Sequence, residues 1–327
     1  MLFRTTVETK PSEKQITYNE KTMFLGSCFA GYIGEQMKLR KMPVMTNPSG
    51  TIYNPESIFT TINNIISGKK AEINDLFNFN GEWISFNHYT DFSSENPHEL
   101  LDKINAQNEK ASAFLRNSSY LFITFGTARI YRLKTMGTVV SNCHKVPANN
   151  FTSELLSVEK IVNRWTSLLD ALSAFNPDLR IIFTISPVRH WKDGAHGNQV
   201  SKSTLFLAVE ELMKHKIKPS YFPAYEIQMD DLRDYRFYAG DMLHPSPSAV
   251  DYIWEKFSEI YFDKTTIELQ SSILKITKAA EHRIMSDSKK KRKSFAEKTL
   301  KQINDITNKT DLIDFNSEIG YFTTMLK

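Results

Sequence analysis

The sequence predicts an α/β sandwich built around a mostly parallel sheet, and three kinds of observation support this prediction. Short apolar runs typical of buried strands lie at residues 22–25 (TMFL), 120–125 (YLFITF) and 180–186 (RIIFTIS). Each run ends at a glycine or a proline, which favour turns. Segments with helical periodicity separate the runs, and strands that alternate with helices are typical of a parallel sheet.

The helices are predicted from apolar residues that recur every three or four positions. Shorter patterns of this kind predict helices over 31–42, 200–214 and 246–262. Residues 68–114 are weakly patterned and rich in Asn, which predicts an insertion or a long loop with a helix at its end. The clearest pattern is in 157–175, where six apolar residues share one face: Ile161, Trp165, Leu168, Leu169, Leu172 and Phe175.

The composition indicates a globular protein. Of 327 residues, 41% are apolar and 12% aromatic, enough for a sizeable core in one large domain, or in one domain with an appendage. Two cysteines suit a reducing compartment. The first residues lack the apolar segment of a signal peptide, and no apolar run approaches the roughly 20 residues of a membrane helix. We therefore expect a cytoplasmic protein without a membrane span.

The positive charge is confined to the C-terminal part of the chain. Residues 264–327 hold 13 Lys and Arg against 8 Asp and Glu, whereas the remainder holds 28 against 29. We predict a main domain over residues 1–263 and a helical, basic extension over 264–327. The run at 289–293 (KKKRK) is expected to be a solvated connection, with contact to an anionic surface as the alternative. Specific nucleic-acid binding is not expected, since no aromatic residues interleave with these lysines.

The candidate nucleophile is Ser27, within residues 26–30 (GSCFA), between the first strand and the helix that follows. In parallel sheets the binding site lies at the carboxyl ends of the strands. A serine at such a turn lies near backbone N–H groups at the positive end of a helix dipole, as an acyl-transfer nucleophile needs. The alternative is that Ser27 only caps the helix, which is a frequent role of serine.

A candidate base lies far along the chain, in residues 241–245 (DMLHP), directly before the predicted helix 246–262. An aspartate three residues before a histidine in a loop can accept a hydrogen bond from the ring Nδ1. The ring Nε2 is then free to take a serine proton, as in a catalytic triad. The alternative is a turn capped by Asp241 beside an ordinary loop residue, His244. Taken together, the two motifs favour a triad of Ser27, His244 and Asp241.

Further segments carry a resemblance to a known family: NPSGTIYNP at 47–55, GTARIY at 126–131, NCHKVP at 142–147, SPVRHWKDGAHGNQVSK at 186–202 and YFPAYEIQMDDLRDYRFYAGDMLH at 221–244. With these and the pentapeptide at 26–30, the chain resembles the GSCFA family, a bacterial branch of the SGNH/GDSL hydrolases, over residues 20–262. The resemblance implies a flavodoxin-like three-layer α/β/α fold. It also implies ester hydrolysis with neither a metal nor an organic cofactor, and it matches Ser27, Asp241 and His244 to the family's triad.

The resemblance also implies an oxyanion hole, and one of its donors departs from the SGNH pattern. The backbone N–H groups of Ser27 and Gly50 are the expected first two donors. SGNH hydrolases have an Asn in the third block, where this chain has Ala128. An oxyanion donor can be worth about 3 kcal/mol in the barrier. Either Thr127 or Asn142 is therefore expected to replace it, or the chemistry is slower or different.

Four basic side chains are candidates for substrate binding: Arg129, His144, Arg189 and His190. Arg189 and His190 follow the strand 180–186, and an arginine there can bind a carboxylate, a phosphate or sugar hydroxyls. The alternative for Arg189 is an ion pair with an acidic residue in 230–234, and Arg129 carries the same ambiguity. The remaining histidines show no ligand-like grouping, so a bound metal is not expected.

The sequence thus predicts a serine esterase that removes O-acyl groups, acetyl above all, from a carbohydrate or a related small-molecule ester. The choice of a carbohydrate comes from the resemblance alone. One alternative is acyl transfer to another hydroxyl by the same triad. Another is a protein that keeps the fold and binds such an ester with little or no turnover. The sequence does not predict the oligomeric state.

Overall fold

The computed structural model describes residues 5–281 and 288–326. In this part of the chain a five-stranded sheet forms the centre, and all its neighbouring strands run parallel. Numbered along the chain, these strands lie in the order 2-1-3-4-5, which is the flavodoxin-like order. The strands in spatial order are β11 (Ser220–Phe222), β10 (Arg180–Ile185), β6 (Ser118–Phe125), β1 (Lys21–Gly26) and β2 (Val44–Thr46).

Both faces of this sheet are buried, because apolar side chains of one strand point alternately to either side. On β6, Tyr120 and Phe122 belong to the core on one face. Leu121, Ile123 and Phe125 belong to the core on the other. The uninterrupted apolar run of β6 is therefore what a strand covered on both sides requires.

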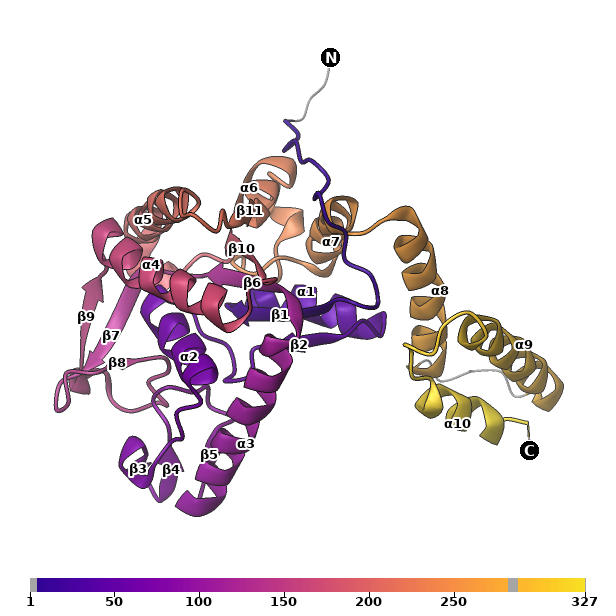
Figure 1. Cartoon of the computed structure of the whole chain (residues 1–327), viewed down its shortest axis with the longest axis horizontal. Coiled ribbons are helices and arrows are strands. Elements are labelled where there is room, and N and C mark those ends of the chain that lie inside the picture. The colour runs from indigo at the N-terminus through magenta and orange to yellow at the C-terminus, as the bar shows by residue number, and fades with distance from the viewer. Residues whose placement is uncertain (1–4, 282–287, 327) are drawn as a thin grey trace.

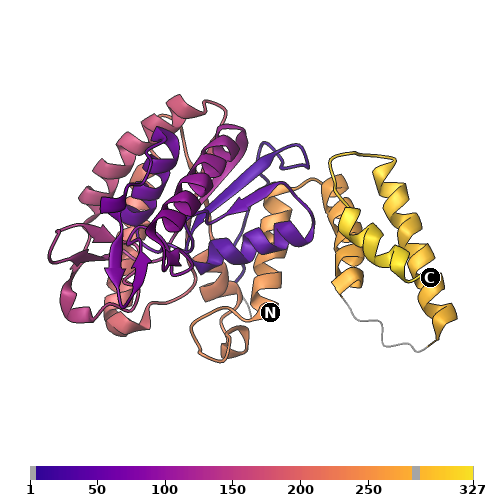
Figure 2. The same cartoon turned by 90° about the horizontal axis from the view of Figure 1, so that it is seen from below.

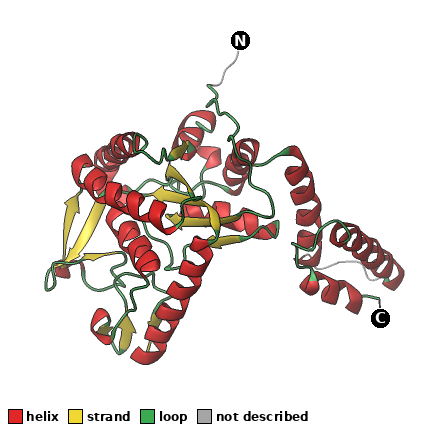
Figure 3. Ribbon diagram, in the orientation of Figure 1, coloured by secondary structure: helices red, strands yellow, loops and turns green. Residues whose placement is uncertain are grey.

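Helices cover the two faces (Figures 1 and 3). On one side lie α1 (Cys28–Leu39) and α7 (Pro247–Tyr261). On the other side lie α2 (Pro55–Ser67), α3 (Pro97–Arg116), α4 (Val158–Phe175) and α5 (Gly194–Leu212). A short helix, α6 (Ala224–Glu226), follows β11. The predicted three-layer α/β/α sandwich with a parallel sheet is confirmed. Among the described residues, no helix is both long enough and apolar enough to cross a membrane.

Two small antiparallel sheets lie beside the sandwich. One contains β3 (Phe77–Phe79), β4 (Glu82–Ile84) and β5 (Ser93–Ser94), within the segment expected to be an insertion that ends in a helix. The other contains β7 (Arg129–Leu133), β8 (Val139–Val140) and β9 (Phe151–Leu155). Strands of two to five residues show too few alternations to be recognised by periodicity, so neither sheet was predicted.

The C-terminal extension is helical, as predicted, and consists of α8 (Lys264–Glu281), α9 (Lys289–Thr307) and α10 (Asn316–Thr324). Figure 2 shows these helices at one end of the molecule, beyond α1. They contact the segment after α1: Gln270 Nε2 lies 2.9 Å from Met42 Sδ, and Lys41 Nζ lies 2.9 Å from Glu318 Oε1. The domain boundary after residue 263 stays a prediction.

The lysine run at 289–293 was expected to lie in a connection between helices. Instead it begins α9, where Ser288 Oγ accepts the backbone N–H of Lys291.

Candidate active site

Ser27 lies at the carboxyl end of β1 and caps the N-terminus of α1. The turn before it depends on Gly26, which has a φ of +131°. A Cβ at Gly26 would lie 2.1 Å from the carbonyl oxygen of Thr124 on the neighbouring strand β6. β1 and β6 are the strands between which the chain order reverses, and ligands of such sheets bind at that point. The local backbone thus fixes Ser27 at the edge where a site is expected.

The Ser27 side chain is buried, with an exposed fraction of 2% for the residue. Its Oγ accepts the backbone N–H of Phe29 at 3.3 Å. The helix-cap alternative therefore describes the side chain correctly. A hydroxyl that accepts a hydrogen bond still has its own proton to donate, so capping α1 and acting as a nucleophile are compatible.

Asp241 and His244 form a compact turn before α7. The carboxylate Oδ2 lies 2.5 Å from the ring Nδ1 of His244. The other oxygen, Oδ1, accepts the backbone N–H groups of Leu243 and His244, each at 2.9 Å. These backbone hydrogen bonds, with the bond to the ring, lower the pKa of Asp241 to about 2. Because Asp241 holds Nδ1, the ring's Nε2 is left for another partner.

Side chains between the two motifs show that they share one edge of the sheet. Tyr53 Oη lies 3.7 Å from Cys28 Sγ, next to Ser27. The Tyr53 ring meets the His190 ring edge-on, with centroids 5.4 Å apart. Burial, together with the positive charges of Lys202 and His244, lowers the pKa of His190 to about 4. His190 is therefore close to both the Ser27 turn and the His244 loop.

Tyr32, one turn into α1, gives a second link. Burial raises its pKa, and the charges of Cys28 and Asp241 raise it further. Among the described residues, no hydrogen bond joins Ser27 Oγ to His244 Nε2. Catalytic hydrogen bonds are often long in free enzymes and shorten when the substrate binds.

The two backbone groups expected in the oxyanion hole make other hydrogen bonds in the free protein. The Ser27 N–H donates to the Thr124 carbonyl at 3.2 Å, and the Gly50 N–H donates to the Asn47 carbonyl at 2.8 Å. Gly50 has a φ of +78°, and a Cβ there would lie 2.2 Å from Tyr89 Cβ. In the first turn of α1, the Cys28 N–H donates to no described residue, which makes it a further candidate donor.

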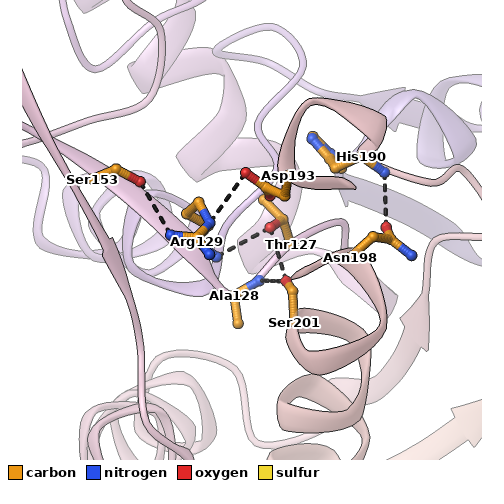
Figure 4. Close-up of polar contacts among 8 residues, drawn as sticks. All are labelled: Thr127, Ala128, Arg129, Ser153, His190, Asp193, Asn198 and Ser201. Carbon is orange, nitrogen blue, oxygen red and sulfur yellow. Dashed lines mark hydrogen bonds and ion pairs between the residues drawn. The ribbon is translucent and has the colours of Figure 1, made fainter. Parts of the chain in front are cut away.

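The two expected replacements for the third donor are also engaged (Figure 4 shows the first). Thr127 Oγ1 lies 2.9 Å from Ser201 Oγ and accepts the backbone N–H of Arg129 at 3.1 Å. Asn142 Oδ1 accepts the backbone N–H of His144 at 2.8 Å. No contact among the described residues brings either side chain to Ser27, so their role stays a prediction.

Among the substrate-binding candidates, Arg129 and His144 make contacts within the protein. Arg129 Nε lies 3.1 Å from Asp193 Oδ1, and its Nη1 donates to Ser153 Oγ at 3.4 Å (Figure 4). The ion-pair alternative thus describes the Arg129 side chain. His144 is buried, and its Nε2 lies 2.9 Å and 3.0 Å from the carbonyl oxygens of Ser85 and His88. These contacts hold His144 against the segment that follows β4.

Sequence comparison decides the family. A model described as the GSCFA family matches residues 21–257. The chain belongs to the GSCFA family. A second model, described as the GSCFA domain protein, C-terminal domain, matches residues 273–327. The expectation that the resemblance ends at residue 262 was therefore too narrow. No curated protein matches the chain.

Among solved structures, the chain is similar to a carbohydrate esterase family 3 protein from Talaromyces cellulolyticus. The match has 10% sequence identity and a TM-score of 0.36, and it covers 77% of this chain and 98% of that one. A similarity of this size says nothing about individual site residues.

Two buried polar residues of this GSCFA protein were missed in the sequence. Lys202 on α5 is fully buried, and its Nζ donates to the carbonyl oxygens of Gly126 at 2.8 Å and Ser186 at 2.6 Å. Lys202 thereby ties the ends of β6 and β10 together. Burial, aided by the charge of Arg189, lowers the pKa of Lys202 to about 7.

Asn198, one turn before Lys202, is also buried. Its Oδ1 accepts the backbone N–H of His190 at 2.8 Å (Figure 4). Its Nδ2 has no hydrogen-bond partner among the described residues. The signal that could have indicated both residues is their position on the buried face of α5, in register with Leu205, Val209 and Leu212.

Proposed function

We propose that this protein is a serine ester hydrolase with Ser27 as the nucleophile and an Asp241–His244 pair as its base. The observation that carries the proposal is the 2.5 Å contact between Asp241 Oδ2 and His244 Nδ1 at the sheet edge that holds Ser27. Asp241 orients the ring so that Nε2 takes the Ser27 proton as Oγ attacks the ester carbonyl. His244 then passes that proton to the leaving alcohol. Water then attacks the acyl-enzyme in the same way, with His244 as its base, and releases the acid.

The proposed substrate is an O-acyl, above all an O-acetyl, ester of a carbohydrate, as the resemblance to SGNH hydrolases implies. For the oxyanion we propose the Cys28 N–H as a donor beside those of Ser27 and Gly50. Its position in the first turn of α1 supports this role, since N–H groups there point at an anion and the helix dipole favours it.

Labelling with a fluorophosphonate tests the nucleophile. The wild-type protein should be labelled at Ser27, and Ser27→Ala should lose the label and at least about 10³-fold in kcat on an aryl acetate. Ser157→Ala is a matched control, because Ser157 Oγ also caps a helix by accepting the N–H of Lys160. In each variant the loss of the helix cap should lower the free energy of unfolding by about 1 kcal/mol. Only Ser27→Ala should lose the label, and labelling of Ser27→Ala at the wild-type level would refute the proposal.

A further inference from the structure

A groove of about 500 Å³ lies beside the candidate triad and has no role in the proposed chemistry so far. Asp241 lines one wall, so a substrate whose ester reaches His244 has room for its remaining part in this groove. The other residues that bear on the argument are Arg189, Trp191, Arg233 and Tyr235. Two come from the segment after β10 and two from the segment after α6.

Two of the charged side chains around the groove, those of Arg233 and Asp234, are neutralised by a neighbour. Arg233 forms an ion pair with Asp230. Asp234 Oδ2 lies 3.7 Å from Arg236 Nε. Asp241 keeps its negative charge, because its partner His244 is neutral when it acts as the base. In the acidic segment that was expected to bind Arg189, the two ion pairs occupy Asp230 and Asp234, and Asp231 accepts the backbone N–H of Val7 and the hydroxyl of Tyr252.

Arg189 has no such neighbour. Within residues 5–281 and 288–326 no carboxylate forms an ion pair with it, and its buried Nε has no hydrogen-bond partner. The sequence alternative, an ion pair with an acidic residue in 230–234, is therefore not formed, because Arg233 and Arg236 occupy Asp230 and Asp234. A buried donor without an acceptor costs free energy, and no hydrogen-bond partner among the described residues offsets that cost here.

A second basic residue, Lys202, interacts with Arg189. Lys202 contacts two carbonyl oxygens and no carboxylate in the described part of the chain. The charge of Arg189 adds to burial in lowering the pKa of Lys202. With a pKa of about 7, Lys202 is only partly protonated near neutral pH, so Arg189 supplies the lasting positive charge, and a positive charge without a carboxylate partner favours an anionic ligand.

Exposed aromatic side chains form the sides of the groove. Trp191 and Tyr235 have exposed fractions of 51% and 77%. The Arg189 guanidinium carbon lies 5.2 Å from the centroid of the Trp191 ring, which restricts where the guanidinium can point. Flat aromatic surfaces with polar edges suit a ring-shaped ligand.

We propose that this groove binds an oxyanionic group, a carboxylate or a phosphate, on the alcohol portion of the ester, and that Arg189 is its principal ligand. Guanidinium groups bind both kinds of oxyanion in a bidentate manner. The inference rests on the proposed function, because the triad places the ester next to the groove. It names the substrate class as O-acyl esters of acidic sugars or sugar phosphates.

Kinetics on matched acetyl esters test the inference. The substrates are acetylated glucuronate, acetylated glucose 6-phosphate and acetylated methyl glucoside. Wild type should prefer at least one charged ester over the neutral one, and the better of the two identifies the anion. In Arg189→Gln the ratio of charged to neutral kcat/KM should fall about 10- to 100-fold, because a charge-assisted hydrogen bond is lost. Arg189→Lys should restore part of the ratio.

Arg233→Gln is the matched control, since Arg233 lines the same groove but is neutralised by Asp230. It should keep the wild-type ratio. An equal ratio in wild type and Arg189→Gln, or an equal fall in Arg233→Gln, would overturn the inference while leaving the esterase intact.

A binding measurement separates this inference from the proposed hydrolysis. Glucuronate, glucose 6-phosphate and glucose are titrated calorimetrically into Ser27→Ala and into Ser27→Ala/Arg189→Gln. Saturable binding of an anionic sugar that is at least tenfold weaker in the double variant supports the subsite, even if wild type hydrolyses no ester. If neither anionic sugar binds Ser27→Ala more tightly than glucose does, the inference is wrong.

Discussion

The two sides of the candidate site are held in place in different ways. Asp241 and His244 lie in an exposed turn whose hydrogen bonds join residues at most five positions apart. The Ser27 turn is buried and depends on distant segments: the Thr124 carbonyl packs against Gly26, and Asn47 Oδ1 accepts the Gly26 N–H at 2.8 Å. Substitutions in the exposed turn should therefore impair chemistry and leave stability nearly unchanged. A substitution that disturbs the backbone of the buried turn, such as one at Gly26, should instead lower the stability of the fold.

The largest effect is expected from Asp241→Asn, on the exposed side. The amide favours the wrong histidine tautomer, so kcat on an aryl acetate should fall by about 10⁴-fold. The carboxylate is exposed and bonds only within its own turn, so the melting temperature should change by no more than a few degrees. Paired rate and melting measurements check this. A large loss of melting temperature would mean that the exposed turn supports the fold, and the two turns would then not differ in their importance for stability.

Gly26→Ala should give the opposite result on the buried side. The new Cβ would lie 2.1 Å from a backbone oxygen, and the backbone has a φ of +131°. We expect a loss of at least about 3 kcal/mol in the free energy of unfolding in urea. Gly68→Ala is the control, since Gly68 also has a positive φ, +67°, but has no neighbour within 4 Å. Its cost should be about 1 kcal/mol. Equal costs would show that the contact between β1 and β6 does not constrain the Ser27 turn.

Lys202 is a buried residue whose contribution to stability should depend on pH. Its pKa is lowered to about 7 in the folded protein, against 10.5 for the ordinary side chain. Between these values the unfolded chain binds a proton that the folded chain does not, so the contribution of Lys202 to stability rises with pH. Below about pH 7 the full cost of burying the charge is present.

Urea denaturation of wild type and Lys202→Met at pH 7 and pH 9 measures this contribution. Relative to the variant, wild type should gain at most about 1.4 kcal/mol per pH unit. A difference between the two proteins that does not change with pH would contradict the account of Lys202.

The sequence predicted the features that are local. The apolar runs of β1, β6 and β10 specify strands covered on both faces, and the spacing of Asp241 and His244 is enough to form their turn. Ser27 was predicted because a glycine and a serine after a buried strand mark a strand-to-helix turn. These inferences need no knowledge of which distant segments meet.

The features that depend on distant contacts were missed or left open. Lys202 and Asn198 lie on α5, and nothing in their spacing indicates that Lys202 reaches the ends of β6 and β10 or that Asn198 reaches His190. The partner of Arg189 was left open between a substrate and an acidic residue in 230–234, because the sequence does not show that Arg233 and Arg236 pair with Asp230 and Asp234. The run at 289–293 was predicted to be a solvated connection because it is a dense run of charge, but lysines at the start of a helix are less favourable only through the helix dipole. Ser288 and the packing of α9 outweigh that effect.

The most direct test of the central claim is a double-variant cycle on Ser27 and His244, measured as kcat on an aryl acetate with the fold checked by circular dichroism. If the two sides act as one catalytic unit, Ser27→Ala and His244→Ala should each lower kcat by at least about 10³-fold. The double variant should then be little slower than either single variant, because removing one member already abolishes the shared step. Losses that multiply in the double variant would mean that Ser27 and His244 act independently, and the triad would be wrong.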